Sequence, residues 1–485
     1  MKLFEYSAGE LHHKLVNKEC SATEIAKDAL ARIADTDSRV GSYVTVTPQV
    51  ALDAARRVDD KIAAGEAIGP LAGIPIAVKD NICTAGTLTT CASKMLHNFV
   101  PPYSATVMDK LNAADMVMVG KANMDEFAMG SSCENSHFGP TKNPRDLTRV
   151  PGGSSGGSAA AVTAGQAVVS LGSDTGGSIR QPAACCGIIG LKPTYGSVSR
   201  YGLVAFASSL DQIGPFGRTV ADVANTYSVL CGHDPMDATS ARRDYPDFAA
   251  LLSADVQGLR IGIPKEYYGA GVVPQVKELV HKALADLEAR GAKLVEVSLP
   301  STDYALSAYY VLSSAEASSN LARFDGVKYG FRAPEYEGLT DLYERTRSQG
   351  FGDEVKRRIM LGTFVLSSGY YDAYYNRAKL MQQTIAAEFA KAFESCDLLA
   401  TPTTPFTAFK LGENVGDPLK MYASDVCTVT VNIAGLPAIS IPCGNQDGLP
   451  VGLQFIGPKF SEQTLLNASL ALEQLRGGLC TVAGL

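Results

Sequence analysis

The chain has 485 residues, 46% of them hydrophobic and 19% charged, which is enough apolar material for a large buried core and excludes a disordered protein. The net charge of −7 and the lack of a long basic run argue against a nucleic-acid-binding protein acting alone, because phosphates are neutralised by clustered Lys and Arg. No secretion signal or membrane-length apolar stretch is visible, so we expect no membrane binding. The charge distribution likewise indicates no DNA binding.

Eleven cysteines are scattered along the chain, and no two have the C-x-x-C spacing typical of zinc and thioredoxin-like sites. We therefore expect no metal site. An odd number of thiols, mostly with apolar neighbours, is typical of a reducing compartment. This pattern predicts a cytoplasmic protein.

The N-terminal segment carries two helix-start signals. Ser7 with Glu10 and Ser21 with Glu24 have capping-box spacing, in which the serine and the glutamate each bind a backbone N–H of the first turn. Each pair opens a helical pattern. We therefore predict N-terminal helices over about residues 7–65.

Strands and helices alternate after this segment. Residues 73–81 and 116–123 have the pattern of strands, with a helix between them at 105–115. A short helix and a buried strand follow within residues 151–182. The alternation predicts an α/β fold with a mixed, largely parallel central sheet covered by helices on both faces, whose core lies at about 70–230.

The second half of the chain continues this alternation around a helical insertion. A strand, a helix and a strand are predicted over 259–300, and a largely helical elaboration over about 303–395. Returning strands are expected at 396–403, 435–443 and 451–457, before a closing helix from about 461. Since no repeat, low-complexity tract or linker occurs, residues 1–485 are predicted to form a single domain.

Residues 151–182 are unusually rich in glycine and serine. The stretch is PGGSSGGSAAAVTAGQAVVSLGSDTGGSIRQP. A flexible linker is excluded, because the two glycine clusters are separated by the predicted helix and strand. Dense glycine in packed elements marks backbone that turns sharply or lies close to another group, so we expect these loops to line a site.

Several familiar motifs fail in this stretch. Ser154 and Ser155 each match G-x-S-x-G, but an α/β-hydrolase needs an acid and then a histidine downstream, and the only later histidines, His233 and His281, fit structural roles better. The D-T-G at 174–176 has no second copy, which an aspartic-protease dyad requires. Neither a phosphate-binding glycine loop nor S-x-x-K occurs.

Lys79 ends an apolar strand in IAVKDN. Since the chain has six histidines in 485 residues, a serine nucleophile here needs another base, and a buried neutral lysine can serve. Taken alone, Lys79 fits a surface residue whose stem covers apolar side chains better than it fits a functional group at the carboxyl edge of a sheet.

Three stretches together resemble the amidase signature family: IAVKDN at Lys79, GGSSGGS around Ser154 and GSDTGGSIRQPA around Ser178. Their intervals of 75 and 24 residues match the Ser-cisSer-Lys triad of that family, and the resemblance covers nearly the whole chain. Within the family, NMDEFAMGSS, KRRIMLG and GLPAISIP are similar to the glutaminase subunits of tRNA-dependent amidotransferases.

The resemblance implies a catalytic core at about 70–230 and a mechanism for it. Ser178 is the nucleophile that attacks a carboxamide carbon and forms an acyl-enzyme. Ser154, which follows a cis peptide bond in the family, relays the proton of Ser178 to Lys79. The chemistry is reasonable, because a hydroxyl needs a base and burial lowers the pKa of a lysine.

The tetrahedral oxyanion of such a reaction needs preorganised hydrogen-bond donors. Successive backbone N–H groups next to the nucleophile can supply them without obstruction from side chains. The predicted oxyanion hole consists of Thr175, Gly176, Gly177 and Ser178.

The substrate implied by the resemblance is free glutamine, which carries a carboxylate and an ammonium. A desolvated pocket for it requires a cation, an anion and a polar contact. The matching residues are Arg358 for the carboxylate, Asp425 for the ammonium and Tyr309 for the polar contact. Gly130 and Ser131 are expected to line the same pocket.

The resemblance also implies partners. In the family, ammonia passes through a channel to a B subunit, which uses ATP and Mg to amidate Glu-tRNA(Gln) or Asp-tRNA(Asn), and a small C subunit completes a heterotrimer. No cofactor is expected in this chain. The negative net charge suits this division, since a partner would handle the tRNA.

Two alternatives remain open. The chain could be a free-standing amidase for hydrophobic or aryl amides, which an apolar residue at 358 or 425 would favour. It could also be a catalytically silent scaffold subunit, which a broken triad would favour. The sequence has neither feature.

Overall fold

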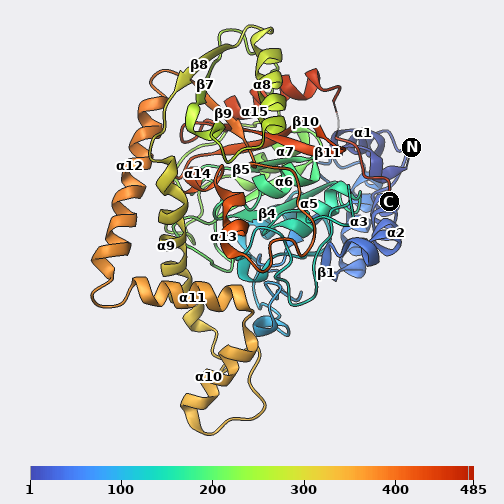
Figure 1. The fold of residues 1–485 in the computed structure, drawn as a ribbon. Helices are drawn as coiled ribbons and strands as arrows, with labels where there is room; N and C mark the ends of the chain where they lie inside the picture. Colours follow the sequence, from blue (N-terminus) through green and yellow to red (C-terminus); the bar gives the residue numbers. More distant parts are fainter. Residues whose placement is uncertain (1, 479) are drawn as a thin grey trace.

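A computed structural model describes residues 2–478 and 480–485, and the eleven strands of this part of the chain form one sheet (Figure 1). The strands are β1 (Tyr43–Val46), β2 (Pro75–Lys79), β3 (Val117–Ala122), β4 (Val169–Asp174), β5 (Ile189–Lys192), β6 (Gln212–Gly217), β7 (Arg260–Pro264), β8 (Lys293–Val297), β9 (Leu398–Pro402), β10 (Ala438–Gln446) and β11 (Leu449–Ile456). Their order across the sheet is β1-β3-β2-β4-β6-β5-β10-β11-β9-β7-β8.

Parallel pairing is confined to the two wings of this sheet. β2 lies parallel to β3 and β4, and β7 lies parallel to β8 and β9, whereas the other pairs of the described strands are antiparallel. The mixed α/β sheet is confirmed, but its centre departs from the largely parallel sheet that we expected. The connections explain the difference: helical crossovers give the parallel pairs, whereas β10 and β11 form a hairpin through Asp447 and Gly448, both at positive φ.

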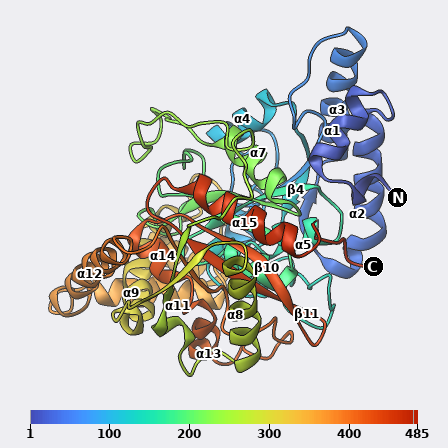
Figure 2. The same cartoon turned by 90° about the horizontal axis from the view of Figure 1, so that it is seen from above.

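Helices enclose the sheet (Figure 2). Successive side chains of a strand point to opposite faces, and every residue of β2, β3, β4, β6 and β11 is buried, so both faces are covered there. The α-helices are α1 (Ala8–Val16), α2 (Ala22–Val40), α3 (Pro48–Ala63), α4 (Thr106–Ala113), α5 (Gly156–Thr163), α6 (Arg180–Cys186), α7 (Val220–Leu230), α8 (Pro274–Glu288), α9 (Thr302–Asn320), α10 (Gly338–Gly350), α11 (Asp353–Val365), α12 (Arg377–Ala392), α13 (Pro418–Tyr422), α14 (Val429–Ala434) and α15 (Glu462–Leu475).

Both predicted helix-start signals are confirmed. Ser7 Oγ accepts a hydrogen bond from Glu10 N at 3.3 Å, and Ser21 Oγ accepts one from Glu24 N at 3.1 Å. Each glutamate carboxylate in turn accepts from the backbone N–H of its serine. These capping boxes begin α1 and α2, and α3 follows after β1.

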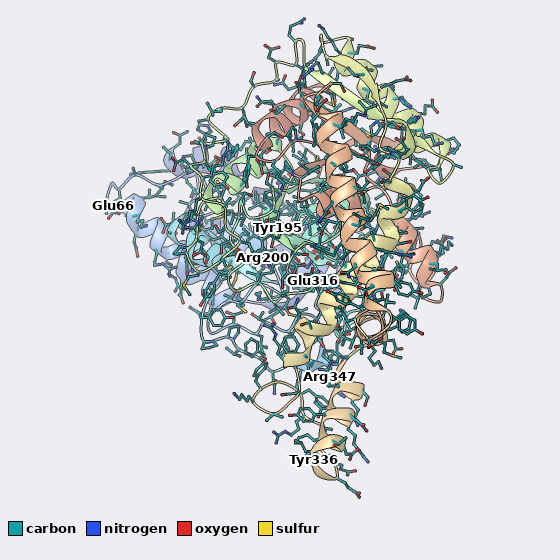
Figure 3. The ribbon with its side chains drawn as sticks, turned by 90° about the vertical axis from the view of Figure 1, so that its left-hand side faces the viewer. Glu66, Tyr195, Arg200, Glu316, Tyr336 and Arg347 are labelled. Atoms are coloured by element: carbon teal, nitrogen blue, oxygen red, sulfur yellow. The ribbon has the colours of Figure 1, made fainter. Side chains whose placement is uncertain are left out.

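The predicted helical elaboration consists of α9 to α12, of which α10 projects away from the sheet (Figure 1). Figure 3 shows Arg347 near the base of this projection and Tyr336 near its tip. α9 packs against α11, α12 and α14. Because α9 carries Tyr309 and α11 carries Arg358, the elaboration contributes two predicted site residues to the core. Among the described helices none is both long and apolar enough to cross a membrane.

Candidate active site

Lys79 lies at the carboxyl end of β2, where this strand runs beside β4, and its side chain is completely buried. Its Nζ donates hydrogen bonds to Ser154 Oγ and Ser155 Oγ, both at 2.8 Å. Two further contacts reach Ser173, at 2.9 Å to Oγ and 3.2 Å to the carbonyl oxygen. The alternative of a surface lysine is therefore wrong.

Burial lowers the pKa of Lys79 to about 7, because the ammonium form loses its hydration there. The carboxylate of Asp125 opposes this shift but does not cancel it. Near neutral pH a large fraction of the amine is therefore unprotonated. In this form it has a lone pair within hydrogen-bond distance of Ser154 Oγ and can accept the hydroxyl proton.

The peptide bond between Gly153 and Ser154 is cis. Gln181 fixes the surrounding turn: its Oε1 accepts from Gly153 N at 2.8 Å, and its Nε2 donates to the carbonyl oxygen of Ser131 at 2.8 Å. A Cβ at Gly153 would overlap the Asp125 carboxylate, so only glycine fits this position. The first glycine cluster therefore shapes the turn that presents Ser154.

Ser178 lies in the loop between β4 and α6 and is 8% exposed. Its carbonyl oxygen accepts a hydrogen bond from Ser155 N at 3.2 Å, which joins the two glycine clusters. Among the described residues its Oγ forms no hydrogen bond. The structure thus brings the loop of Ser178 to the Lys79–Ser154 pair, while the proton relay between the two serine hydroxyls stays a prediction.

The Asp174 carboxylate organises the loop that leads to Ser178. It accepts from Gly177 N at 2.8 Å and Asn432 Nδ2 at 2.9 Å, and it forms a buried ion pair with Arg180 at 3.0 Å. Burial alone would raise the pKa of Asp174, but the Arg180 guanidinium lowers it to about 2. The carboxylate is therefore charged at neutral pH and holds the loop to α6.

The four predicted oxyanion donors are not equally available. The N–H of Gly177 already binds Asp174, because the carboxylate lies within the turn. In the described chain the N–H groups of Thr175, Gly176 and Ser178 have no hydrogen-bond partner. An oxyanion hole at this loop therefore rests on these three groups more than on Gly177.

Tyr309 packs its ring directly against the loop between β4 and α6 that carries Ser178. A Cβ on Gly176 would lie 2.5 Å from Tyr309 Cζ and 2.6 Å from its hydroxyl oxygen. Gly177 has a φ of +142°, and a Cβ there would overlap the side chain of Thr428. The second glycine cluster therefore allows two neighbours to approach the backbone, and it places the Tyr309 hydroxyl beside the loop of Ser178.

Arg358 and Asp425 both contact Tyr310. The guanidinium carbon of Arg358, which is 2% exposed, lies 4.4 Å from the centroid of the Tyr310 ring. The Tyr310 hydroxyl donates to Asp425 Oδ2 at 3.0 Å, and Ser131 Oγ donates to the same oxygen at 2.8 Å. Burial raises the pKa of Asp425 to about 7. A guanidinium and a carboxyl group thus lie next to one tyrosine.

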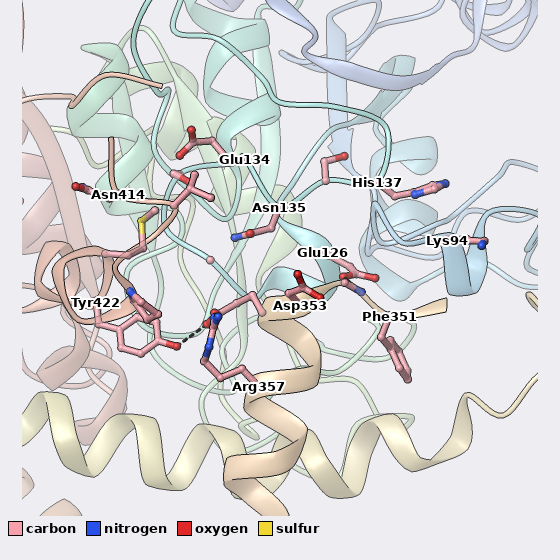
Figure 4. A pocket seen from close by; sticks show the side chains of 18 of the residues that line it. Lys94, Glu126, Glu134, Asn135, His137, Phe351, Asp353, Arg357, Asn414 and Tyr422 are labelled. Atoms are coloured by element: carbon pink, nitrogen blue, oxygen red, sulfur yellow. Dashed lines mark hydrogen bonds and ion pairs between the residues drawn. The ribbon is translucent and has the colours of Figure 1, made fainter. Parts of the chain in front are cut away.

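A cavity of about 410 Å³ adjoins this pair (Figure 4). Gly130, which precedes Ser131, lines it together with Tyr422 and Glu354. The Tyr422 hydroxyl donates to Glu354 Oε1 at 2.7 Å. Of the predicted site residues only Gly130 lines this cavity, so the cavity lies beside the predicted site and does not contain it.

Sequence reasoning missed Gln181, Tyr310 and Glu354. Gln181 lies within the quoted motif, but no pattern distinguishes an amide that binds a turn from one on a helix surface. Tyr310 directly follows the predicted Tyr309. Glu354 precedes Arg358 by four residues, a spacing at which acidic and basic side chains pair on a helix, so the sequence did contain a signal for it.

All eleven cysteines are free thiols. Within residues 2–478 and 480–485, no group of three or more His, Cys, Asp and Glu side chains is placed to hold a metal ion. The absence of a cofactor in this chain stays a prediction.

The fold and the buried serine–lysine site agree with a comparison of protein families. A family model described as Amidase matches residues 24–466. The chain belongs to the amidase family.

Among known relatives, the A subunit of the glutamyl-tRNA(Gln) amidotransferase of Desulforamulus reducens is 61% identical over 474 residues, and the match covers 98% of both chains. The protein of the same name from Heliobacterium modesticaldum is 58% identical over 477 residues, again with 98% of each chain covered. The similarity therefore extends well beyond the motifs of the site.

Solved structures have the same fold. The A subunit of the glutamyl-tRNA(Gln) amidotransferase of Thermotoga maritima has a TM-score of 0.83 at 42% identity, covering 100% of this chain and 98% of that one. The native peptide amidase of Stenotrophomonas maltophilia has a TM-score of 0.81 at 31% identity, covering 99% and 98%.

Proposed function

We propose that the chain is the glutaminase subunit of a tRNA-dependent amidotransferase. It hydrolyses glutamine through Lys79, Ser154 and Ser178 and supplies the ammonia to a partner subunit. The observation that carries the proposal is the combination of two features: a fully buried lysine 2.8 Å from a serine hydroxyl, and a buried arginine and a buried aspartate that both contact Tyr310 and match the charges of an amino-acid zwitterion.

The reaction begins with a proton transfer. Ser178 Oγ gives its proton to Ser154 and attacks the carboxamide carbon, while Ser154 passes its own proton to neutral Lys79. The negative oxygen of the tetrahedral intermediate is stabilised by free backbone N–H groups of the nucleophile loop. The relayed proton returns to the amide nitrogen, ammonia leaves, and water hydrolyses the glutamyl ester on Ser178.

Substrate recognition uses the other half of the site. Arg358 binds the α-carboxylate and Asp425 the α-ammonium, with the Tyr309 hydroxyl as a further polar contact. Gly130 and Ser131 complete the pocket wall. These assignments are supported by the position of Tyr309 against the nucleophile loop and by Tyr310, which contacts both charged groups.

The names of the relatives support the partners that the family resemblance implies. Since these are A subunits of glutamyl-tRNA(Gln) amidotransferases, we propose a heterotrimer with subunits B and C in the cytoplasm. The B subunit would use ATP and Mg to convert Glu-tRNA(Gln), Asp-tRNA(Asn) or both with the ammonia delivered from this chain.

The test measures glutamate release from glutamine by the tagged chain, purified natively with whatever accompanies it. Ser178→Ala is expected to reduce the rate by about a thousandfold or more, because the nucleophile is lost. Ser253→Ala, an exposed serine, is the matched control and should leave the rate unchanged.

Further measurements distinguish the proposal from its two alternatives. Addition of ATP with Glu-tRNA(Gln) or Asp-tRNA(Asn) should enhance the wild-type rate. Cleavage of aryl amides with glutamine left untouched would instead indicate a free-standing amidase. A wild-type chain that a serine-directed fluorophosphonate does not label would be a silent scaffold.

A further inference from the structure

Arg358 is a buried guanidinium that uses only part of its hydrogen-bonding capacity. Its Nε donates to Glu354 Oε1 at 2.6 Å. Among the described residues its two Nη groups have no hydrogen-bond partner, although the side chain is only 3% exposed. A guanidinium has five N–H donors in a fixed plane, so this arrangement leaves four of them for a ligand.

Glu354 fixes the orientation of this guanidinium. It lies one helical turn before Arg358 on α11, and its side chain is 10% exposed. Its Oε1 accepts from both Arg358 Nε and the Tyr422 hydroxyl, and its Oε2 pairs with Arg357. Because Nε is held, turning the plane of the guanidinium would break the charge-assisted hydrogen bond from Arg358 Nε to Glu354.

The same carboxylate also supports the aromatic surface beneath Arg358. Tyr422, which binds Glu354, stacks on Tyr310 with the ring centroids 4.0 Å apart. The guanidinium carbon lies 4.4 Å and 4.8 Å from the centroids of Tyr310 and Tyr422. Since Tyr310 in turn donates to Asp425, one network connects Glu354 to both charged groups of the pocket.

We propose that Glu354 is a positioning residue that makes the site select amides bearing an α-carboxylate. This inference rests on the proposed glutaminase function. Glu354 acts through Arg358 and not on the reacting carboxamide, so its loss should weaken the binding of carboxylate-bearing substrates and leave the chemical step intact.

The test compares two substrates. The first is glutamine, and the second is 4-aminobutanamide, which has the amide and the amine of glutamine but no carboxylate. In Glu354→Gln, KM for glutamine should rise about tenfold or more, with kcat changed less than about threefold, because a charge-assisted bond at Arg358 is weakened. The kinetics of 4-aminobutanamide should not change.

Asp353→Asn is the matched control. It removes the same charge from the same helical turn, but its side chain is 90% exposed and pairs with Lys356. It should leave both KM values as in the wild type. A loss of similar size in both variants would mean that a general charge effect of the helix start is responsible, which would overturn the inference.

A double-mutant cycle separates positioning from simple structural support. Once Arg358→Ala has removed the guanidinium, adding Glu354→Gln should cause no further rise in KM for glutamine. Equal additional losses in both backgrounds, equal losses for both substrates, or an unchanged KM in Glu354→Gln would overturn the inference. A wild-type enzyme that does not hydrolyse glutamine would refute the proposed function itself.

Discussion

Lys79 and Asp425 are buried groups that the proposed reaction needs in different charge states. Burial lowers the pKa of Lys79 to about 7, which favours the neutral amine that acts as a base. Burial raises the pKa of Asp425 to about 7, which disfavours the carboxylate that binds an ammonium. Both groups therefore take up a proton as the pH falls through about 7, and each protonation removes a function.

The pH dependence of kcat/KM tests these two roles. For glutamine we expect the logarithm of kcat/KM to fall below pH 7 with a slope approaching about two, since two protonations are harmful. Glutaric acid monoamide, which lacks the ammonium, should give a slope of about one from Lys79 alone. Identical slopes for the two substrates would contradict the role of Asp425.

Lys79→Arg provides the control for the base. A guanidinium keeps its proton at every accessible pH, so this variant should be inactive from pH 6 to 9 while retaining a buried cation. Recovery of activity at high pH in Lys79→Arg would show that another group accepts the proton.

At the scale of secondary structure, the sequence predicted the elements better than their pairing. Residues 73–81 contain β2, and 116–123 contain β3, because apolar runs bounded by turn residues identify buried strands. Periodicity does not say which strands become neighbours, so the antiparallel centre of the sheet was not predicted. The DG at Asp447–Gly448, a strong hairpin signal, was present but not used.

The candidate site shows the same limit. Lys79, Ser154 and Ser178 were predicted from motif spacing and a family resemblance, and the structure brings Lys79 and Ser154 into hydrogen-bond contact. Gln181 was not found, because its role depends on a turn that only the folded chain forms. The hydrogen bond from Gly177 N to the Asp174 carboxylate was not predicted either, since no sequence pattern reveals it.

The loop between β4 and α6 should tolerate no side chain at Gly177. In Gly177→Ala the added Cβ overlaps Thr428 at a φ of +142°, which costs about 2–5 kcal/mol through strain and overpacking. We expect a lower denaturation midpoint and at least a tenfold loss of glutamine hydrolysis. In Gly271→Ala the Cβ meets no atom within 4 Å, so this control should behave as the wild type. Equal midpoints for the two variants would contradict the packing argument.

At the scale of the whole molecule, the two halves of the chain are joined at one central strand pair and through the C-terminal segment. β5 pairs with β10 in the centre of the sheet, and the C-terminal segment returns to the N-terminal half, where Ala483 N donates to the carbonyl oxygen of Thr163 at 2.8 Å. Arg32 Nη2 donates to the carbonyl oxygen of Ala483 at 3.2 Å. Among the described strands, β1 to β6 form one side of the sheet and β7 to β11 the other, and the pair β5–β10 joins the two sides.

Thermal unfolding can test the prediction that residues 1–485 form a single domain. We expect one calorimetric unfolding transition, with equal calorimetric and van't Hoff enthalpies, because removal of either half exposes strand edges of the other. A separate early transition that Arg358→Ala shifts but Gly177→Ala does not would mean that α9 to α12 unfold as an independent unit.

The position of Tyr310 between Arg358 and Asp425 has a stereochemical consequence. Under the proposed function, the carboxylate, the ammonium and the carboxamide of the substrate each have a separate anchor, at Arg358, Asp425 and the loop of Ser178. Three anchors around one α-carbon define its handedness. The mirror image of glutamine can satisfy any two of them but must turn its third group away, so the pocket is expected to distinguish the two enantiomers.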